Sequence, residues 1–218
     1  MDEVLNVGMV LLSDPGVTAT QVRECGEPLV DLRDVDALRL DHRLADSAGA
    51  FARLRVGVVD RLVTAQTLLP AGTRLLVIEG YRPLSLQEHY FEAHVRRLRD
   101  RTPDADESAL RRHASRYISP PAVAPHVAGA AVDLTLCSVD GEELPMGTAV
   151  NDTDTTACHT DSPDIGAPAR ANRDLLCAAL HGAGLVNYPS EWWHWSYGDR
   201  YWAYLTGSDH ALYGPVSA

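Results

Sequence analysis

Residues 130–137 read Ala-Ala-Val-Asp-Leu-Thr-Leu-Cys, a largely apolar, alternating run that predicts a β-strand. Residues 74–79 read Arg-Leu-Leu-Val-Ile-Glu, and this short aliphatic run predicts a buried strand, which the Gly-Tyr-Arg-Pro stretch after it ends. Shorter runs at 185–187 and 192–197 predict further strands, whereas residues 14–46, with apolar pairs such as Leu29-Val30, predict an irregular segment with at most a short strand. The two longer runs therefore form the expected centre of a sheet.

Helical periodicity separates these strands. Apolar residues recur at helical spacing over 46–69, where Asp46 or Ser47 can cap the start and the Pro-Ala-Gly run that follows ends the helix. Further helices are predicted over 84–101, 107–116 and 169–181. Because helices and strands do not alternate as β-α-β units, this order favours an α+β fold with an antiparallel sheet. We predict one domain over residues 1–218.

Composition excludes several classes of partner. The 218 residues include 19 basic side chains, all arginine, and 30 acidic ones, for a net charge of −11. Such a chain binds nucleic-acid backbones and anionic membranes poorly, so we predict neither partner. No apolar run approaches the ~18 residues of a membrane span. The acidic start, with only a short apolar stretch after it, is unlike a secretory signal, so we predict a cytoplasmic protein.

The first chemically informative segment joins His126 to Asp133 within the predicted strand at 130–137. An aspartate between valine and leucine is costly to bury unless a cation meets it. A divalent metal is one such partner, while an arginine or backbone donors are the structural alternative. This segment alone does not decide between the two.

A second segment, Glu-Trp-Trp-His-Trp at 191–195, places Glu191 and His194 among three tryptophans. It could be an aromatic edge of the core with its polar groups bound to backbone. Alternatively, His194 is a third ligand beside His126 and Asp133, since three nitrogen and oxygen ligands plus water are typical of catalytic zinc. Glu191 would then be the general base of a metal-assisted hydrolysis.

The third segment is Tyr-Arg-Pro at 81–83, directly after the predicted strand at 74–79. Arg82 could pair with Glu79 or with a carboxylate in a loop. Beside a metal, it could instead stabilise the oxyanion of a tetrahedral intermediate.

Taken in order, the three segments resemble the D-alanyl-D-alanine dipeptidases of the VanX type. These belong to a wider group that includes lysostaphin, D-Ala-D-Ala carboxypeptidases and the hedgehog signalling domain, and the likeness extends from Glu27 through nearly the whole chain. The resemblance implies a small central antiparallel sheet flanked by helices. It also implies a zinc held by His126, Asp133 and His194, Glu191 as base, Arg82 at the transition state, and a cytoplasmic dipeptide substrate.

Two positions depart from the pattern of this family. Ala124 stands where a serine is usual, and Asn151 stands where an aspartate is usual. Both family residues look like holders of the substrate ammonium, which alanine and a neutral amide bind poorly. We take Tyr81, Asn151 and Trp193 as the candidate substrate contacts.

The sequence thus predicts a zinc peptidase that acts on a D-Ala-D-Ala-type dipeptide, with a small peptide as its partner. The alternatives are a zinc carboxypeptidase or amidase with another small substrate, and a zinc-binding module without catalysis. Residues 140–165, rich in Asp, Thr, Gly and Pro, predict a long loop of the kind that is often functional.

Overall fold

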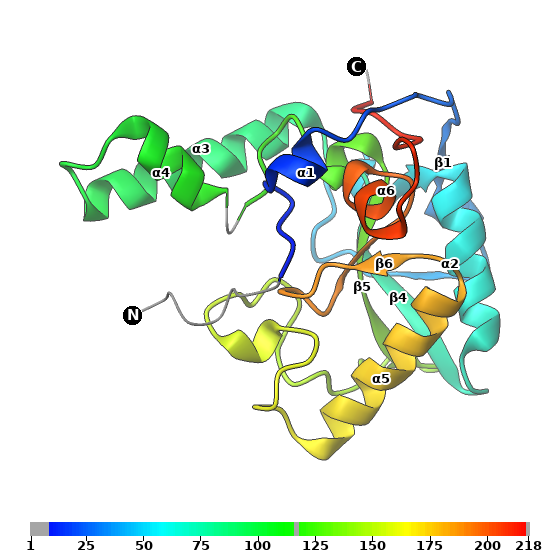
Figure 1. Cartoon of the computed structure of the whole chain (residues 1–218). Helices are drawn as coiled ribbons and strands as arrows, with labels where there is room; N and C mark the ends of the chain where they lie inside the picture. Colours follow the sequence, from blue (N-terminus) through cyan, green and yellow to red (C-terminus); the bar gives the residue numbers. More distant parts are fainter. Residues whose placement is uncertain (1–8, 116–117, 217–218) are drawn as a thin grey trace.

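The computed structural model describes residues 9–115 and 118–216, and its centre is a five-stranded sheet with the order β2-β4-β5-β7-β6 (Figure 1). Neighbouring strands are antiparallel, except that β2 and β4 run parallel. The strands of this sheet are β2 (Arg39–Leu40), β4 (Thr73–Glu79), β5 (Ala131–Ser138), β6 (Val186–Asn187) and β7 (His194–Ser196). A separate antiparallel pair joins β1 (Leu29–Asp31) to β3 (Arg53–Arg55). The predicted α+β fold is therefore confirmed, with β2 as its one parallel exception among the described strands.

Helices cover the sheet and extend beyond it. In Figure 1, α2 and α5 lie side by side on one side of the sheet, while the α3–α4 hairpin projects away from it. The helices are α1 (Pro15–Thr18), α2 (Val56–Leu68), α3 (Leu84–Arg101), α4 (Glu107–Ala114), α5 (Ala167–Gly182) and α6 (Arg200–Thr206). Short 3-10 turns occur at Leu32–Asp34, Ala50–Ala52, Pro125–Ala128 and Thr156–Cys158. Within the described ranges, no helix has the length and apolar character needed to cross a membrane.

The central strand β5 has two faces with different roles. Val132, Leu134 and Leu136 belong to the main core, which also contains apolar residues of α2 and α5. Because successive side chains of a strand point to opposite faces, Asp133 lies on the face away from that core. The alternation of β5 thus turns one carboxylate toward a separate site without breaking the hydrophobic layer.

The predicted helix over 46–69 is wrong over its first ten residues. The α-helix begins only at Val56, after a 3-10 turn and strand β3. Gly49 adopts a left-handed conformation with φ of 67°, which interrupts a helix. Asp46 caps this local turn, since its carboxylate accepts hydrogen bonds from the backbone N–H groups of Ala48 and Phe51. The pairing of β3 with β1 then fixes the extended segment, which local periodicity cannot reveal.

The other predicted elements agree closely with the structure. The helix predicted over 84–101 is α3, and those over 107–116 and 169–181 correspond to α4 and α5 within two residues at each described end. Arg116, the last residue of the helix predicted over 107–116, lies outside the described residues. Sequence patterns do not predict α1, α6, β2 and β3, because each is short and is held mainly by its neighbours.

Candidate metal centre

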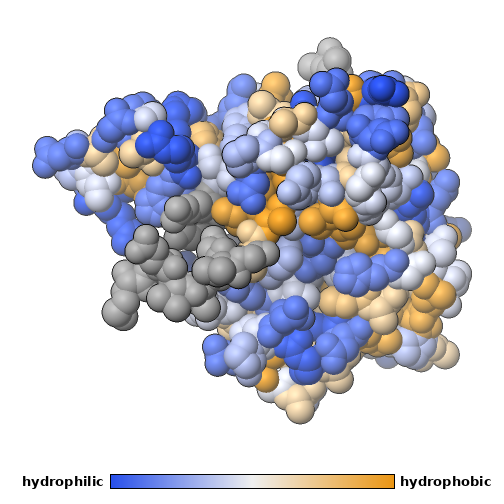
Figure 2. Space-filling view, in the orientation of Figure 1, coloured by the Kyte–Doolittle hydropathy of each residue, from blue (hydrophilic) through white to orange (hydrophobic). Residues whose placement is uncertain are grey.

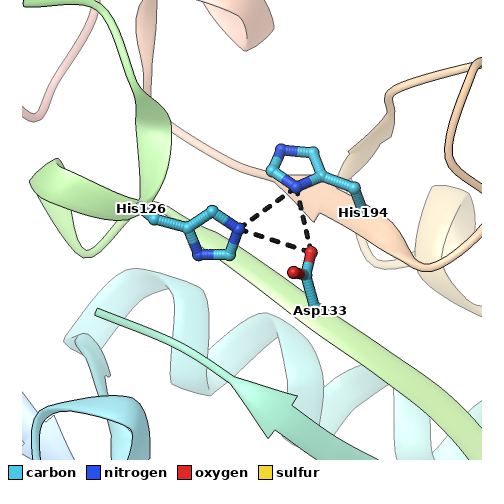
Figure 3. A group of neighbouring side chains, drawn as sticks. All are labelled: His126, Asp133 and His194. Atoms are coloured by element: carbon cyan, nitrogen blue, oxygen red, sulfur yellow. Dashed lines mark hydrogen bonds and ion pairs between the residues drawn. The ribbon is translucent and has the colours of Figure 1, made fainter. Parts of the chain in front are cut away.

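His126, Asp133 and His194 converge in the interior, as Figure 3 shows. The Asp133 Oδ1 atom lies 3.0 Å from His194 Nδ1 and 3.3 Å from His126 Nε2. The two imidazole nitrogens are 3.2 Å apart. All three side chains are buried, and their ligand atoms lie within 4.8 Å of one another. Two imidazoles and one carboxylate at this spacing could hold a divalent metal ion, and the donor types suit zinc.

Hydrogen bonding outside the cluster orients His126. Its Nδ1 atom lies 2.7 Å from the carbonyl oxygen of Gly80, so this nitrogen carries the proton and donates it. The lone pair of Nε2 is therefore free to face the centre, which is the usual arrangement behind a metal-bound histidine. His126 itself sits in the 3-10 turn Pro125–Ala128, which Gly129 ends with φ of 64°.

Sheet pairing places the other two ligands. Asp133 on β5 lies directly opposite His194 on β7, so their side chains share one face of the sheet. On its other side, Asp133 pairs with Glu79 of β4. The register of β4 shifts between Val77 and Glu79, and this β-bulge brings Glu79 rather than Ile78 opposite Asp133. Because paired residues point to the same face, the bulge turns the Glu79 carboxylate from the core toward the metal ligands.

A cavity of about 330 Å³ opens at this row of side chains. The three ligands line it, together with Glu191 and Arg82. Glu191 enters from a tight turn between β6 and β7, where its backbone N–H donates to the carbonyl of Tyr188 at 2.8 Å. The structure thus brings together all five residues that the sequence suggested for metal binding and catalysis.

Glu191 lies next to the ligands with its carboxyl group partly exposed to the cavity. Its Oε2 atom is 4.0 Å from His194 Nδ1, and 22% of the side-chain surface is accessible. Burial raises the pKa of Glu191 to about 7, and the nearby His194 and Arg82 oppose this shift. A carboxyl group with a pKa near neutrality can both take up and release a proton.

Arg82 reaches the cavity while paired with Glu79. Its Nε and Nη2 atoms donate to the two carboxylate oxygens at 2.7 and 2.5 Å, and Nη1 donates to the side chain of Gln87 at 2.7 Å. The ion pair between Arg82 and Glu79, one of the alternatives that the sequence left open, is therefore present. Arg82 keeps two further N–H donors, since a guanidinium carries five.

Of the three predicted substrate contacts, the structure places one, Asn151, at the cavity. Asn151 lines the cavity, as does Ala124. Trp193 has no accessible surface and belongs to the main core, so its prediction as a substrate contact is corrected: the indole packs instead of facing the cavity. Tyr81 is also not among the residues that line the cavity. The sequence of a short strand or turn does not reveal which of its aromatic rings face the core and which face the cavity.

Several residues at the site carry no distinctive sequence signal. Gln87 and Tyr188 line the cavity, and Gln87 supports Arg82. In the sequence, the Glu79 carboxylate stands out only as a possible partner of Arg82. A glutamine in the first turn of a helix and a tyrosine in a turn are too common to stand out, so only the assembled fold identifies them.

A buried arginine holds the long loop that forms one wall of the cavity. Arg173 of α5 is 1% exposed, and its guanidinium donates to the backbone carbonyls of Met146, Ala157 and His159 at 2.7, 2.8 and 2.6 Å. The same loop accepts a hydrogen bond from the backbone N–H of Trp192 at Cys158. Arg173 thereby ties the loop to α5, and the Trp192–Cys158 hydrogen bond ties it to the turn that carries Glu191.

Comparisons with known proteins agree with this geometry. A family model described as D-ala-D-ala dipeptidase matches residues 56–210. A D-alanyl-D-alanine dipeptidase of Synechocystis sp. is 28% identical over 239 aligned positions, which cover 91% of this chain and 95% of that protein. A D-alanyl-D-alanine dipeptidase of Escherichia coli is 30% identical over 125 positions, covering 57% of this chain and 55% of that protein.

Two solved structures show a weaker likeness. The first is a vancomycin resistance D,D-pentapeptidase, VanY, in complex with Zn(II), with a TM-score of 0.42, 15% identity, and coverage of 77% of this chain and 83% of that one. The second is the LD-carboxypeptidase LdcB, with a TM-score of 0.48, 18% identity, and coverage of 87% and 76%.

Proposed function

The chain belongs to the D-Ala-D-Ala dipeptidase family, and we propose that it is a zinc-dependent peptidase that hydrolyses a short peptide of the D-Ala-D-Ala type. The observation that carries this proposal is the convergence of His126, Asp133 and His194 beside the Glu191 carboxyl group, at the wall of one cavity. A site that only bound metal would need neither Glu191 nor Arg82 there.

The residues present fit zinc. Two neutral imidazoles and a carboxylate are common zinc ligands, and three protein ligands leave a position open for chemistry. Burial on its own would raise the pKa of Asp133, but the two imidazoles beside it lower that pKa, so the ligand is ionised at neutral pH. When bound, zinc supplies Lewis acidity, which activates water and polarises a carbonyl group.

The side chains of the cavity supply the proton transfers. Glu191 takes the proton from the attacking water as the oxygen bonds to the peptide carbonyl carbon. The same carboxyl group then delivers this proton to the leaving amine as the C–N bond breaks. The free N–H donors of Arg82 stabilise the negative charge that develops on the carbonyl oxygen, and Glu79 holds the guanidinium in place for this.

A carboxypeptidase or amidase activity on another small substrate is the second candidate. It is favoured by the cavity wall, where Ala124 and Asn151 offer no carboxylate to a substrate ammonium. Both candidates share the same metal and the same hydrolytic residues. The single-domain organisation and the cytoplasmic location stay predictions.

A metal and activity assay tests the proposal. Elemental analysis of the purified protein is expected to give one zinc per chain, and hydrolysis of D-Ala-D-Ala is expected to stop on chelation and return with added zinc. His126→Ala and His194→Ala each leave two ligands and are expected to lose both zinc and activity. His181→Ala, an exposed histidine at the end of α5, is the matched control and is expected to keep both. Full zinc in both ligand variants would contradict the site.

A further inference from the structure

Arg173 of α5 is an arginine in the interior, where this residue type is seldom found. The arginines of the α3–α4 hairpin, such as Arg96, are exposed, and most of the visible surface of that hairpin is hydrophilic in Figure 2. Arg173 is 1% exposed, and within the described ranges no carboxylate forms an ion pair with it. Asp174, its neighbour in the chain, lies 3.7 Å from Arg170 instead. A buried charge of this kind is costly unless other polar groups meet it.

Backbone carbonyl groups take the place of a carboxylate. The guanidinium of Arg173 donates to the carbonyls of Met146, Ala157 and His159 at 2.7, 2.8 and 2.6 Å. Its Cζ atom also lies 5.4 Å from the centroid of the Trp192 ring, within the range of a cation–π contact. Burial lowers the pKa of Arg173 to about 10, so the group is still charged at neutral pH. The charge strengthens all three hydrogen bonds to the loop.

These hydrogen bonds join the two ends of one loop segment. Met146 directly precedes residues 147–156, and the other two carbonyls directly follow them, so a single side chain closes this segment. Gly147 allows the close approach, because a Cβ atom there would lie 3.3 Å from Arg173 Nη2 and 2.6 Å from Ile165 Cγ2. A planar fork with donors in several directions is a property of arginine that lysine lacks.

The tip of this segment forms part of the cavity wall. Asn151 and Thr153 line the cavity. Within the described ranges, the hydrogen bonds of residues 149–155 stay inside the loop itself. The position of the tip therefore depends on how its two ends are held, and Arg173 holds both.

The base and the metal ligands are held by other contacts. The backbone N–H of Glu191 donates to the carbonyl of Tyr188 at 2.8 Å, and its carbonyl accepts from the N–H of His194 at 3.1 Å. Asp133 and His194 are fixed by the pairing of β5 with β7. A change at Arg173 is therefore expected to move the substrate-side wall and to leave the hydrolytic centre in place.

We propose that Arg173 is a positioning residue for substrate binding: by closing the loop segment, it holds the Asn151 side chain at the cavity, where the amide contacts a polar group of the bound dipeptide. This inference rests on the proposed peptidase function. Arg173 itself touches neither the substrate nor the metal, so its effect is on KM and passes through the loop.

Four variants separate this role from a contribution to fold stability alone. Arg173→Met keeps most of the bulk and removes the donors, while Arg173→Lys keeps the charge without the fork. Arg170→Met is the matched control, since Arg170 lies one turn earlier on α5 and donates at 3.0 Å to the carbonyl of Thr160, outside residues 146–159. Leu180→Ala controls for lost stability, because it truncates a fully buried side chain of the same helix.

The measurements are kcat and KM for D-Ala-D-Ala, zinc content and Tm. Arg173→Met is expected to raise KM roughly threefold to tenfold, the loss of one neutral hydrogen bond to the substrate, with kcat and zinc unchanged. Arg173→Lys is expected to raise KM less, and it decides the question if the methionine variant does not fold. Arg170→Met and Leu180→Ala are expected to keep the native KM, although Leu180→Ala lowers Tm. Unchanged KM values in both Arg173 variants, or an equal rise in Leu180→Ala, would overturn the positioning role.

Asn151→Gly tests the route through the loop. Asn151 has φ of 66°, which glycine adopts readily, so this change removes the amide without straining the backbone. In this background, Arg173→Met is expected to raise KM by less than about twofold, because the contact that it positions is already gone. A rise as large as that in the wild-type background would show that Arg173 does not act through Asn151.

Binding separates failure of the positioning role from failure of the peptidase. Calorimetric titration of D-Ala-D-Ala into the zinc-loaded protein with Glu191→Gln, with and without Arg173→Met, measures the same step without turnover. A Kd weaker by roughly threefold to tenfold supports the role, and an unchanged Kd refutes it. A wild type that binds the dipeptide and does not cleave it refutes the proposed function instead and leaves the comparison of Kd values valid.

Discussion

Arg82 and Glu79 form a two-pronged ion pair at the wall of the cavity, with N···O distances of 2.7 and 2.5 Å. Both side chains are largely buried, with 14% and 8% of their surface accessible. The pair exists because a β-bulge turns Glu79 to the face of the metal ligands. Glu79 therefore neutralises and orients an arginine that lines the cavity and keeps two further N–H donors.

This pairing predicts the effect of changes at Arg82. Arg82→Lys keeps the charge but loses the fork that binds Glu79, so the donor toward the substrate is misplaced. We expect kcat to fall by roughly 10²–10³-fold, with a smaller change in KM, because the charge it meets develops in the transition state. Arg33→Lys is the control, since Arg33 makes the same two-pronged pair with Asp31 on the surface. An altered KM with normal kcat would make Arg82 a ground-state binder.

Glu191→Gln separates metal binding from catalysis. The amide occupies the same space but cannot accept the proton of the attacking water, so turnover is expected to fall by roughly 10²–10⁴-fold. Zinc content is expected to stay at one per chain, because the three ligands are intact. Glu143→Gln, at an exposed glutamate in the loop after β5, provides the comparison. Near-native turnover of the Glu191 variant would show that another group is the base.

Metal affinity is expected to fall as the pH drops. Burial alone would lower the pKa of His126, but the adjacent Asp133 raises it above its usual value, so protons compete with the metal for His126. Asp133 has a lowered pKa and stays ionised over the same range. Binding is thus complete above the pKa of His126 and weakens below it, by about tenfold per pH unit for one competing proton.

Thermal unfolding reports this competition directly. The difference in Tm between zinc-loaded and metal-free protein is expected to narrow as the pH falls through the raised pKa of His126. The Tm of the metal-free protein itself is expected to fall as the pH rises through that pKa, because the charged His126–Asp133 pair that stabilises it at low pH is then lost. A Tm difference that is constant from pH 8 to 5 would contradict the assignment of His126 as a ligand.

Recognition of the substrate amino group is expected to be weak. Ala124 and Asn151 line the cavity and provide no carboxylate, so D-Ala-D-Ala and its N-acetyl form are expected to have similar kcat/KM values. Asn151→Asp combined with Ala124→Ser is expected to favour the free dipeptide roughly tenfold or more, through one charge-assisted hydrogen bond. Asn151 has φ of 66°, a conformation that aspartate also tolerates, so the change suits the backbone.

The measurement is kcat/KM for both peptides with the native protein and the double variant. A strong native preference for the free dipeptide would show that a different carboxylate holds the ammonium. Asp152 and Asp154, which are exposed on the same loop, would then be the residues to change.

Local sequence patterns determined most elements of this protein. The alternation of residues 130–137 and the periodicity of 84–101 predicted β5 and α3, because a strand or helix of this length shows its period within its own segment. The prediction failed at 46–55, where a left-handed Gly49 and the pairing of β3 with β1 override the apolar spacing. The three short motifs also named the candidate ligands, since their residue types and order carry that signal.

Only the tertiary structure decided how those residues face one another. Glu79, Asp133 and His194 come from segments far apart in the chain, and pairing of β4, β5 and β7 places them in one row. The same packing buried Trp193 and paired Arg82 with Glu79. These outcomes depend on strand register, a bulge and the packing of a helix. Each is an interaction between distant segments, and no local period records it.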